Sequence, residues 1–228
     1  KYLIWYYILM KLSVNVPTEL SELTLGQYQK FLKVQKDNGD GIFVAQKMIE
    51  IFCGIDLKDT FKIKITDINE IVAILNEILE IKPDLIHKFK LNDLEYGFLP
   101  VLEDISLGEY VDIETFMQNW DEMHKAMNVL YRPIAQKHKD KYNIVEYEGL
   151  ESDTMKDMPL DVCFSSVVFF YNLGIELSSN MMDYLTDQEM ENLSTEQLNS
   201  IKGGGGIQQF TNSLKEVLQN SRISLGRN

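Results

Sequence analysis

Cysteine is scarce in this chain, and no catalytic motif takes its place. The 228 residues include two cysteines, Cys53 and Cys163, which lie far apart in the sequence. That spacing is typical of neither a disulfide framework nor a zinc site, and the three histidines are not paired either. No G-x-S-x-G nucleophile motif occurs. We therefore expect a reducing compartment, no metal, no cofactor and no enzymatic activity.

Positive charge is the second shortage. Lysine and arginine number 22 against 35 acidic residues, which gives a net charge of −13. Nucleic acids and anionic membranes both select for basic surfaces, so we expect neither as a partner. Arg132 is the only arginine inside the predicted folded region. We interpret it as a structural residue that ties the helix before it to the preceding acidic segment.

Apolar residues are plentiful, at 45% of the chain, and their spacing predicts a folded, mainly helical protein. In the first third, Thr24 is expected to cap a helix over residues 25–35. A second helix is expected over 43–52, ended by Gly54. Residues 61–65 alternate and suggest a short strand. Thr66 is then expected to cap a helix over 67–81.

The middle of the chain predicts a small antiparallel sheet. Residues 86–91 and 94–98 flank Asn92-Asp93 and indicate a β-hairpin. Residues 142–147 alternate as a further strand that could pair with this hairpin. Between them, one helix begins at Ser106 and another covers 120–131, ended by Pro133. The predicted fold class is α+β, predominantly α-helical: a helical bundle with a small central antiparallel β-sheet.

The last third returns to helix. Residues 160–177 follow Pro159 and are apolar nearly all round, which is typical of a membrane span or a central buried helix. Asp161, Asn172 and Glu176 favour the buried helix, because charges inside a membrane are costly. Capping boxes at 186–189 and 194–197 predict two short helices, and 210–218 predicts a last amphipathic one.

These patterns suggest a division of the chain. Residues 1–9, KYLIWYYIL, precede Met10 and are interpreted as a mis-called upstream extension or, if native, as an apolar patch that needs a partner. Residues 10–202 form a single mainly helical domain, with the hairpin near 86–98. Glycines 203–206 are expected to form a linker. Residues 207–228 are expected to form a C-terminal helix, which docks in cis or on a partner, and a loose tail.

A search for chemistry leaves one open alternative. Five carboxylates lie close together in the sequence and could hold Mg²⁺ or act in acid–base catalysis: Glu103, Asp104, Glu109, Asp112 and Glu114. A solvated acidic face is the favoured interpretation. His124 is predicted to lie on the surface, whereas Ser165 and Ser166 are predicted to bond to carbonyls within their helix.

Several segments resemble proteins of tailed bacteriophages. The matching segments are residues 96–116 (YGFLPVLEDISLGEYVDIETF), 126–134 (AMNVLYRPI), 142–149 (YNIVEYEG), 155–162 (MKDMPLDV) and 169–174 (FFYNLG), with a weaker match at 25–31 (LGQYQKF). In these segments the chain is similar to virion structural and tail-assembly proteins, including tail assembly chaperones. The resemblance implies no catalytic residues, and it implies the host cytoplasm or the virion as the location.

The resulting hypothesis is a non-enzymatic phage structural or tail-assembly protein. Its expected partners are other virion or tail-assembly proteins, or further copies of itself as a homo-oligomer. The residues expected to make those contacts are Tyr96, Phe98, Tyr110, Trp120, Arg132, Phe169 and Phe170. Two alternatives remain open: a carboxylate-dependent metal-binding hydrolase or nuclease, and an adaptor that binds a host protein through an apolar groove.

Overall fold

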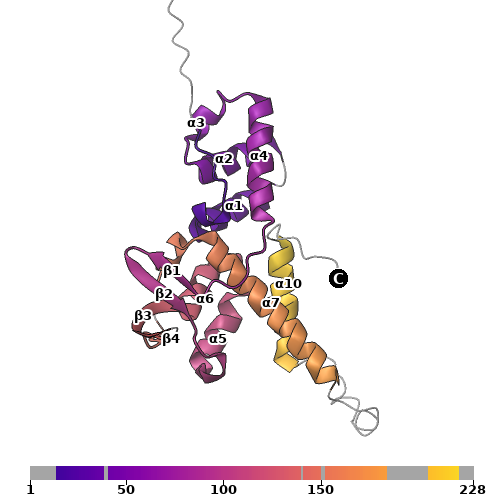
Figure 1. Cartoon of the computed structure of the whole chain (residues 1–228). Coiled ribbons are helices and arrows are strands. Elements are labelled where there is room, and N and C mark those ends of the chain that lie inside the picture. Colours follow the sequence, from indigo (N-terminus) through magenta and orange to yellow (C-terminus); the bar gives the residue numbers. More distant parts are fainter. Residues whose placement is uncertain (1–13, 39–40, 140, 150–151, 184–204, 221–228) are drawn as a thin grey trace, which may run out of the picture.

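A computed structural model describes residues 14–38, 41–139, 141–149, 152–183 and 205–220 (Figure 1). Helices outweigh one four-stranded antiparallel sheet in these residues. The predicted α+β, helix-dominant fold class is therefore confirmed. The start of the chain, including residues 1–9, and the capping boxes at 186–189 and 194–197 lie outside the described residues.

The N-terminal third is helical. It contains η1 (Leu20–Glu22), α1 (Leu25–Asn38), α2 (Ile42–Cys53), α3 (Leu57–Thr60) and α4 (Ile65–Leu79). Thr24 caps α1 as predicted: its hydroxyl accepts a hydrogen bond from the Gln27 N–H at 3.2 Å, and the Gln27 side-chain oxygen accepts one from the Thr24 N–H at 2.9 Å. Gly54 ends α2 in the left-handed region, with φ of 67°.

Two predictions in this third are wrong. Residues 61–65 form no strand, because Phe61 lies in a turn after α3 and Ile65 begins α4. Both side chains are exposed, so the apparent alternation has no buried face. Thr66 does not cap α4 either. Lys64 occupies the cap position, and the Thr66 hydroxyl bonds to Asp67 inside the helix.

The sheet has the order β1-β2-β3-β4. The hairpin is confirmed: β1 (Lys88–Leu91) pairs with β2 (Leu94–Phe98). Asn92 and Asp93 form its turn with φ values of 48° and 62°, as a two-residue turn of this type requires. β2 then pairs with β3 (Tyr131–His138), and β3 pairs with β4 (Lys141–Ile144).

The third strand was not predicted. The segment expected as one helix over 120–131 is the 3₁₀ turn η3 (Trp120–Glu122) followed by α6 (Met123–Leu130). α6 continues directly into β3, and Pro133 lies inside that strand, opposite Tyr96. Pro133 therefore marks no break in regular structure. As a consequence β4, which begins at Lys141 and ends at Ile144, pairs with β3 rather than with the hairpin.

α7 (Leu160–Asp183) begins near the centre of the molecule and extends outward beside α10 (Figure 1). Its start is tied to the start of α1, because the Leu160 N–H donates to the Leu23 carbonyl at 2.8 Å and the Leu25 N–H to the Met158 carbonyl at 3.0 Å. Within the described residues, Leu160–Leu177 is the one stretch long and apolar enough to span a membrane. Residues 162–167 of it are buried in the protein.

The last described helix, α10 (Gly205–Asn220), packs along α7 (Figure 1). It begins earlier than predicted, so Gly205 and Gly206 belong to a helix and not to a linker. Glycines 203 and 204 lie outside the described residues. Buried apolar side chains form a cluster that includes residues from Leu20 to Leu218, and α10 therefore docks in cis.

Candidate interaction site

Helix α5 (Leu107–Phe116) is held firmly against the sheet. Ser106 caps it: the Ser106 hydroxyl accepts from the Glu109 N–H at 3.2 Å, and Glu109 Oε2 accepts from the Ser106 N–H at 2.7 Å. The other carboxylate oxygen of Glu109 accepts from Arg132 on β3 at 2.6 Å. Arg132 thus ties the sheet to the acidic segment. The predicted link to that segment is confirmed, but Arg132 makes it from β3 and not from the helix before it.

The electrostatics of this pair follow from its surroundings. Burial alone would raise the pKa of Glu109, but the hydrogen bonds from Ser106 and the positive charge of Arg132 outweigh it. The net result is a pKa below the ordinary value. Glu109 is therefore ionised at neutral pH and is used in positioning α5.

One face of α5 is apolar and exposed. Leu107, Tyr110 and Val111 lie three and four positions apart, so they share a face of the helix. Their exposed fractions are 79%, 43% and 47%. The opposite face, with Ile113, packs into the core. Scattered apolar residues on a surface are ordinary, but three on one helix face indicate a contact surface.

This exposed face adjoins an apolar cleft of about 240 Å³ between α5 and α7, which we name the α5–α7 cleft. Its lining residues come from η2 (Leu102–Asp104), α5, α7 and α10: Leu102, Ile105, Tyr110, Ile113, Glu114, Phe170, Leu173, Gly174, Leu177 and Phe210. Leu177 at its α7 side is 42% exposed. Among the described residues of the lining, Glu114 is the only charged one.

α10 covers the neighbouring strip of α7. Its buried residues are Leu214, Val217 and Leu218, and Thr211 lies against Gly174. A Cβ atom at Gly174 would overlap the Thr211 side chain, so the glycine allows the two helices to approach closely. At the end of α10, the indole N–H of Trp120 donates to the Val217 carbonyl at 2.9 Å.

The charge around α5 is one-sided. Residues 91–124 include nine aspartates and glutamates and no lysine or arginine. Glu109 is neutralised by Arg132, and Asp112 accepts a hydrogen bond from Tyr147. Glu103, Asp104 and Glu114 have no ion-pair partner among the described residues. The α5 side of the cleft therefore carries unpaired negative charge.

A second hollow, of about 560 Å³, lies on the other side of α5. Its lining includes Arg132, Glu109, Asn143 and Tyr147. The Arg132 guanidinium lies 5.8 Å from the centre of the Tyr147 ring, and burial together with Asp112 raises the pKa of Tyr147. Within this hollow Glu109 bonds to Ser106 and to Arg132, and the Tyr147 hydroxyl donates to Asp112 beside it. These bonds favour a structural role for the three elements that meet here.

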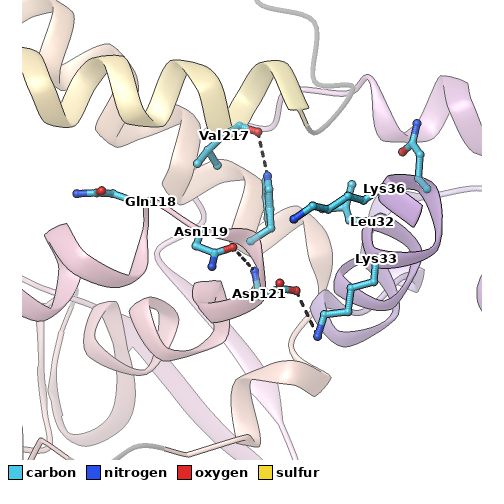
Figure 2. A pocket seen from close by; sticks show the side chains of 9 residues that line it. Leu32, Lys33, Lys36, Gln118, Asn119, Asp121 and Val217 are labelled. Carbon is cyan, nitrogen blue, oxygen red and sulfur yellow. Dashed lines mark hydrogen bonds and ion pairs between the residues drawn. The ribbon is translucent and has the colours of Figure 1, made fainter. Parts of the chain in front are cut away.

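A third hollow, of about 430 Å³, lies between α1, η3 and α10 (Figure 2). Lys33 and Lys36 of α1 extend toward η3, which carries Asp121, and Val217 of α10 lies at the opposite side. The Lys33 Nζ–Asp121 Oδ1 distance is 3.3 Å, and both side chains are substantially exposed. Such an ion pair contributes little to stability, and the hollow marks where α10 meets Trp120.

The structure separates the residues that the sequence suggested for partner contacts. Tyr96, Phe98 and Trp120 are buried in the core, with exposed fractions of 7%, 2% and 7%. They are too enclosed to contact a partner in this fold. The sequence suggested them because the spacing of aromatic residues does not distinguish core residues from surface residues. Arg132 is occupied by Glu109.

The remaining three predicted residues are Tyr110, Phe169 and Phe170. Tyr110 and Phe170 meet in the α5–α7 cleft. Phe169 is partly buried and lines a different hollow, with Pro83 and Leu85. The cleft residues that the sequence analysis missed are Leu107 and Val111 beside it and Leu173 and Leu177 within it. The three-and-four spacing of Leu107, Tyr110 and Val111 was the available signal.

The carboxylates between 103 and 114 do not converge. Glu109 and Asp112 bond to Arg132 and Tyr147, whereas Glu114 faces the cleft. In the part of the chain that the structure describes, no group of three or more histidine, cysteine, aspartate or glutamate side chains is placed to hold a metal ion. The geometry therefore gives the predicted metal-binding alternative no support.

The prediction for His124 is wrong. His124 is 5% exposed and bonds through Nδ1 to Gln29 at 3.1 Å, while its Nε2 lies 3.2 Å from Asp153. Burial, with a further contribution from Lys156, lowers the pKa of His124. His124 joins α1 to α6 in the core. A single polar residue in the sequence does not show which face of its helix is buried, so the position of His124 on the inner face of α6 was missed.

The two serines behave as predicted. Ser165 and Ser166 donate to the Val162 carbonyl at 2.7 and 3.1 Å. Cys163 is fully buried, and burial raises the pKa of its thiol. These groups are packed in the core and are inaccessible to a substrate.

Comparisons with known proteins add no relative: no family model, no curated protein and no solved structure matches this chain.

Proposed function

We propose that this protein acts without catalysis, through protein–protein contacts, as a structural or tail-assembly protein of a tailed bacteriophage. The observation that carries the proposal is the α5–α7 cleft with the exposed apolar face of α5 beside it. Contiguous apolar surface beside a cleft is typical of sites for protein partners. The apolar faces of α5 and α7 that line the cleft are surfaces on which a protein partner can pack.

The phage-like segments support the same conclusion by their location. Residues 96–116 include all of α5, and residues 169–174 include Phe170, Leu173 and Gly174 of α7. The two segments supply most of the cleft. The segments at 126–134 and 142–149 supply most of α6, most of β4 and the part of β3 that holds Arg132. The resemblance and the cleft therefore concern the same part of the molecule.

The experiment is to follow the protein in purified phage particles and in assembly intermediates. Quantitative mass spectrometry is expected to detect it in one of the two fractions. Presence in finished particles indicates a structural component, and presence in intermediates alone indicates a chaperone. A monomeric protein that is absent from both fractions would contradict the proposal.

A pair of variants links this result to the cleft. Leu107→Glu places a charge on the exposed face of α5 and is expected to reduce association at least tenfold, because the apolar contact is lost. Phe61→Glu is the matched control, since Phe61 is 71% exposed, similar to Leu107, and lies far from the cleft after α3. Equal effects of the two variants would assign the contact to another surface.

A further inference from the structure

We propose that the α5–α7 cleft binds an amphipathic helix whose apolar face is bordered by lysine and arginine. The inference rests on the proposed function, because it names the chemistry of the partner for the same site. It follows from three properties of the described residues: the shape of the cleft, the helix already packed beside it, and the sign of the charge around it.

The shape favours a helix. The cleft lies between two helices, α5 and α7, and its lining consists mostly of large apolar residues, with one small residue, Gly174. Leu107, Tyr110 and Val111 extend the apolar surface beyond the cleft along α5. An apolar stripe with residues three and four positions apart matches such a groove, as in other helix-in-groove contacts.

α10 shows that α7 accepts a helix of this kind. It places Leu214, Val217 and Leu218 inward, and leaves Lys215 and Glu216 exposed. Its Phe210 reaches the edge of the cleft. α10 covers one strip of α7, whereas the strip that faces α5 remains open among the described residues. A partner helix would lie on this open strip, beside α10.

Charge selects the partner. Glu114 lines the cleft, and Glu103 and Asp104 lie on the 3₁₀ turn that contributes Leu102. None of the three has a basic partner in the described residues, and no lysine or arginine occurs between residues 91 and 124. A second copy of this chain would bring the same acidic edge and a net charge of −13, so like charges would face each other. A basic border on the partner is complementary.

The test is a selection from a displayed library of helices with a fixed leucine and phenylalanine stripe and randomised border positions. The bait is the full chain, and Leu177→Glu with Tyr110→Glu is used for counter-selection. Both residues are exposed, so this variant is expected to fold, which circular dichroism checks. We expect the helices that prefer the native chain to be enriched in lysine and arginine at the border.

One selected helix is then measured by fluorescence anisotropy. Glu103→Lys with Glu114→Lys is expected to weaken binding about three- to tenfold, and added salt is expected to reduce that difference. Glu77→Lys on α4 with Glu80→Lys at its C-terminal cap is the matched control, because both glutamates are exposed and the change in net charge is identical. The control is expected to bind within about twofold of the native chain.

The inference is overturned if no helix prefers the native chain, if the selected borders are neutral or acidic, or if the two double variants bind alike. Its failure is distinct from failure of the proposed function. If the chain is found in particles or assembly intermediates but its cleft selects helices with neutral borders, the inference of a basic partner helix fails and the proposed function stands. Absence from both fractions contradicts the phage role and leaves the measured helix preference as it stands.

Discussion

The two halves of α7 are made of similar residues but are used differently. Residues 160–167 are almost all buried, and two serines fix them to their surroundings: the Ser166 hydroxyl bonds to Tyr131 Oη at 2.8 Å, and Ser165 Oγ accepts from the Ile86 N–H at 3.2 Å. Residues 168–177 are half-buried or exposed, except Gly174, and line the cleft. Apolar composition therefore does not distinguish a core helix from a contact surface.

The difference lies in what surrounds each half. The first half lies between α1, the sheet and α6. There the Phe164 ring packs edge-on against Tyr28, with ring centres 5.2 Å apart, and at a tilt against Trp120, with ring centres 5.8 Å apart. The second half is covered on one side by α10 and is open toward α5. Mutations in the first half should affect global stability, and mutations in the second half should affect docking.

The largest effect is expected for Phe164→Ala. Phe164 is fully buried, so the variant should lose about 3–5 kcal/mol of the free energy of unfolding through a cavity among aromatic rings. Urea denaturation followed by circular dichroism measures it. Phe170→Ala in the second half is the matched control and should lose about 1–2 kcal/mol, because Phe170 is partly exposed already. Equal losses would remove the distinction between the halves.

Tyr131→Phe should give the next largest effect. The Tyr131 hydroxyl donates to the Ile86 carbonyl at 2.7 Å and bonds to Ser166, so its loss leaves buried groups unpaired and should cost about 1–3 kcal/mol. The comparison is Tyr110→Phe in the cleft, where the change should stay below about 0.5 kcal/mol. A similar loss at both tyrosines, measured by urea denaturation, would contradict the account.

Gly174→Ala should release α10 locally without unfolding the core. The new methyl group overlaps Thr211, and overpacking of this kind costs about 1–3 kcal/mol. Hydrogen exchange should therefore accelerate in residues 210–218, while residues 160–167 remain protected. Thr211→Ala on the same chain should restore protection, because it removes the overlapping hydroxyl. Unchanged exchange in Gly174→Ala would show that the two helices do not pack this closely.

Glu109→Gln should change how stability depends on pH. The folded pKa of Glu109 is lowered, so its ionised form stabilises the fold above the ordinary value of 4.5, and this contribution is lost as pH falls through the lower folded pKa. The stability advantage of the native chain over Glu109→Gln should thus be constant between about pH 7 and pH 5 and shrink below about 4.5. Urea denaturation at a series of pH values measures it.

The control for this prediction is Glu77→Gln, which removes an exposed carboxylate from α4 that forms no ion pair with the described residues. If the two variants show the same pH dependence, the ion pair between Glu109 and Arg132 does not position α5.

The smallest effect on stability is expected for Leu177→Ala. Its side chain is 42% exposed at the cleft, so the free energy of unfolding should fall by less than about 0.5 kcal/mol. Binding of a partner helix should nevertheless weaken at least fivefold, as measured by fluorescence anisotropy. A large stability loss together with unchanged binding would identify Leu177 as a core residue.

Local signals in the sequence predicted much of the fold. Thr24, Gly54, Ser106 and Pro159 mark helix ends correctly, and Asn92-Asp93 specifies the hairpin turn, because each acts through bonds or dihedral angles of its own neighbourhood. β3 was missed because its evidence is non-local. Pro133 resembles a helix stop, and only pairing with β2 and β4 makes it part of a strand.

The candidate site was predicted less well than the fold. Tyr110 and Phe170 were identified, but so were Tyr96, Phe98 and Trp120, which are buried. Aromatic side chains serve cores and surfaces equally, and which role applies depends on elements distant in sequence. The cleft itself requires α5, α7 and α10 together, and these elements are separated by long stretches of chain.

Site-specific photo-crosslinking in cells that assemble particles tests the central claim most directly. A photoreactive phenylalanine at position 110 lies in the cleft, and one at position 61 reports on a more exposed surface elsewhere. The account predicts a single virion or tail-assembly protein crosslinked from position 110 and not from position 61. No crosslink from position 110, or the same product from both positions, would contradict it.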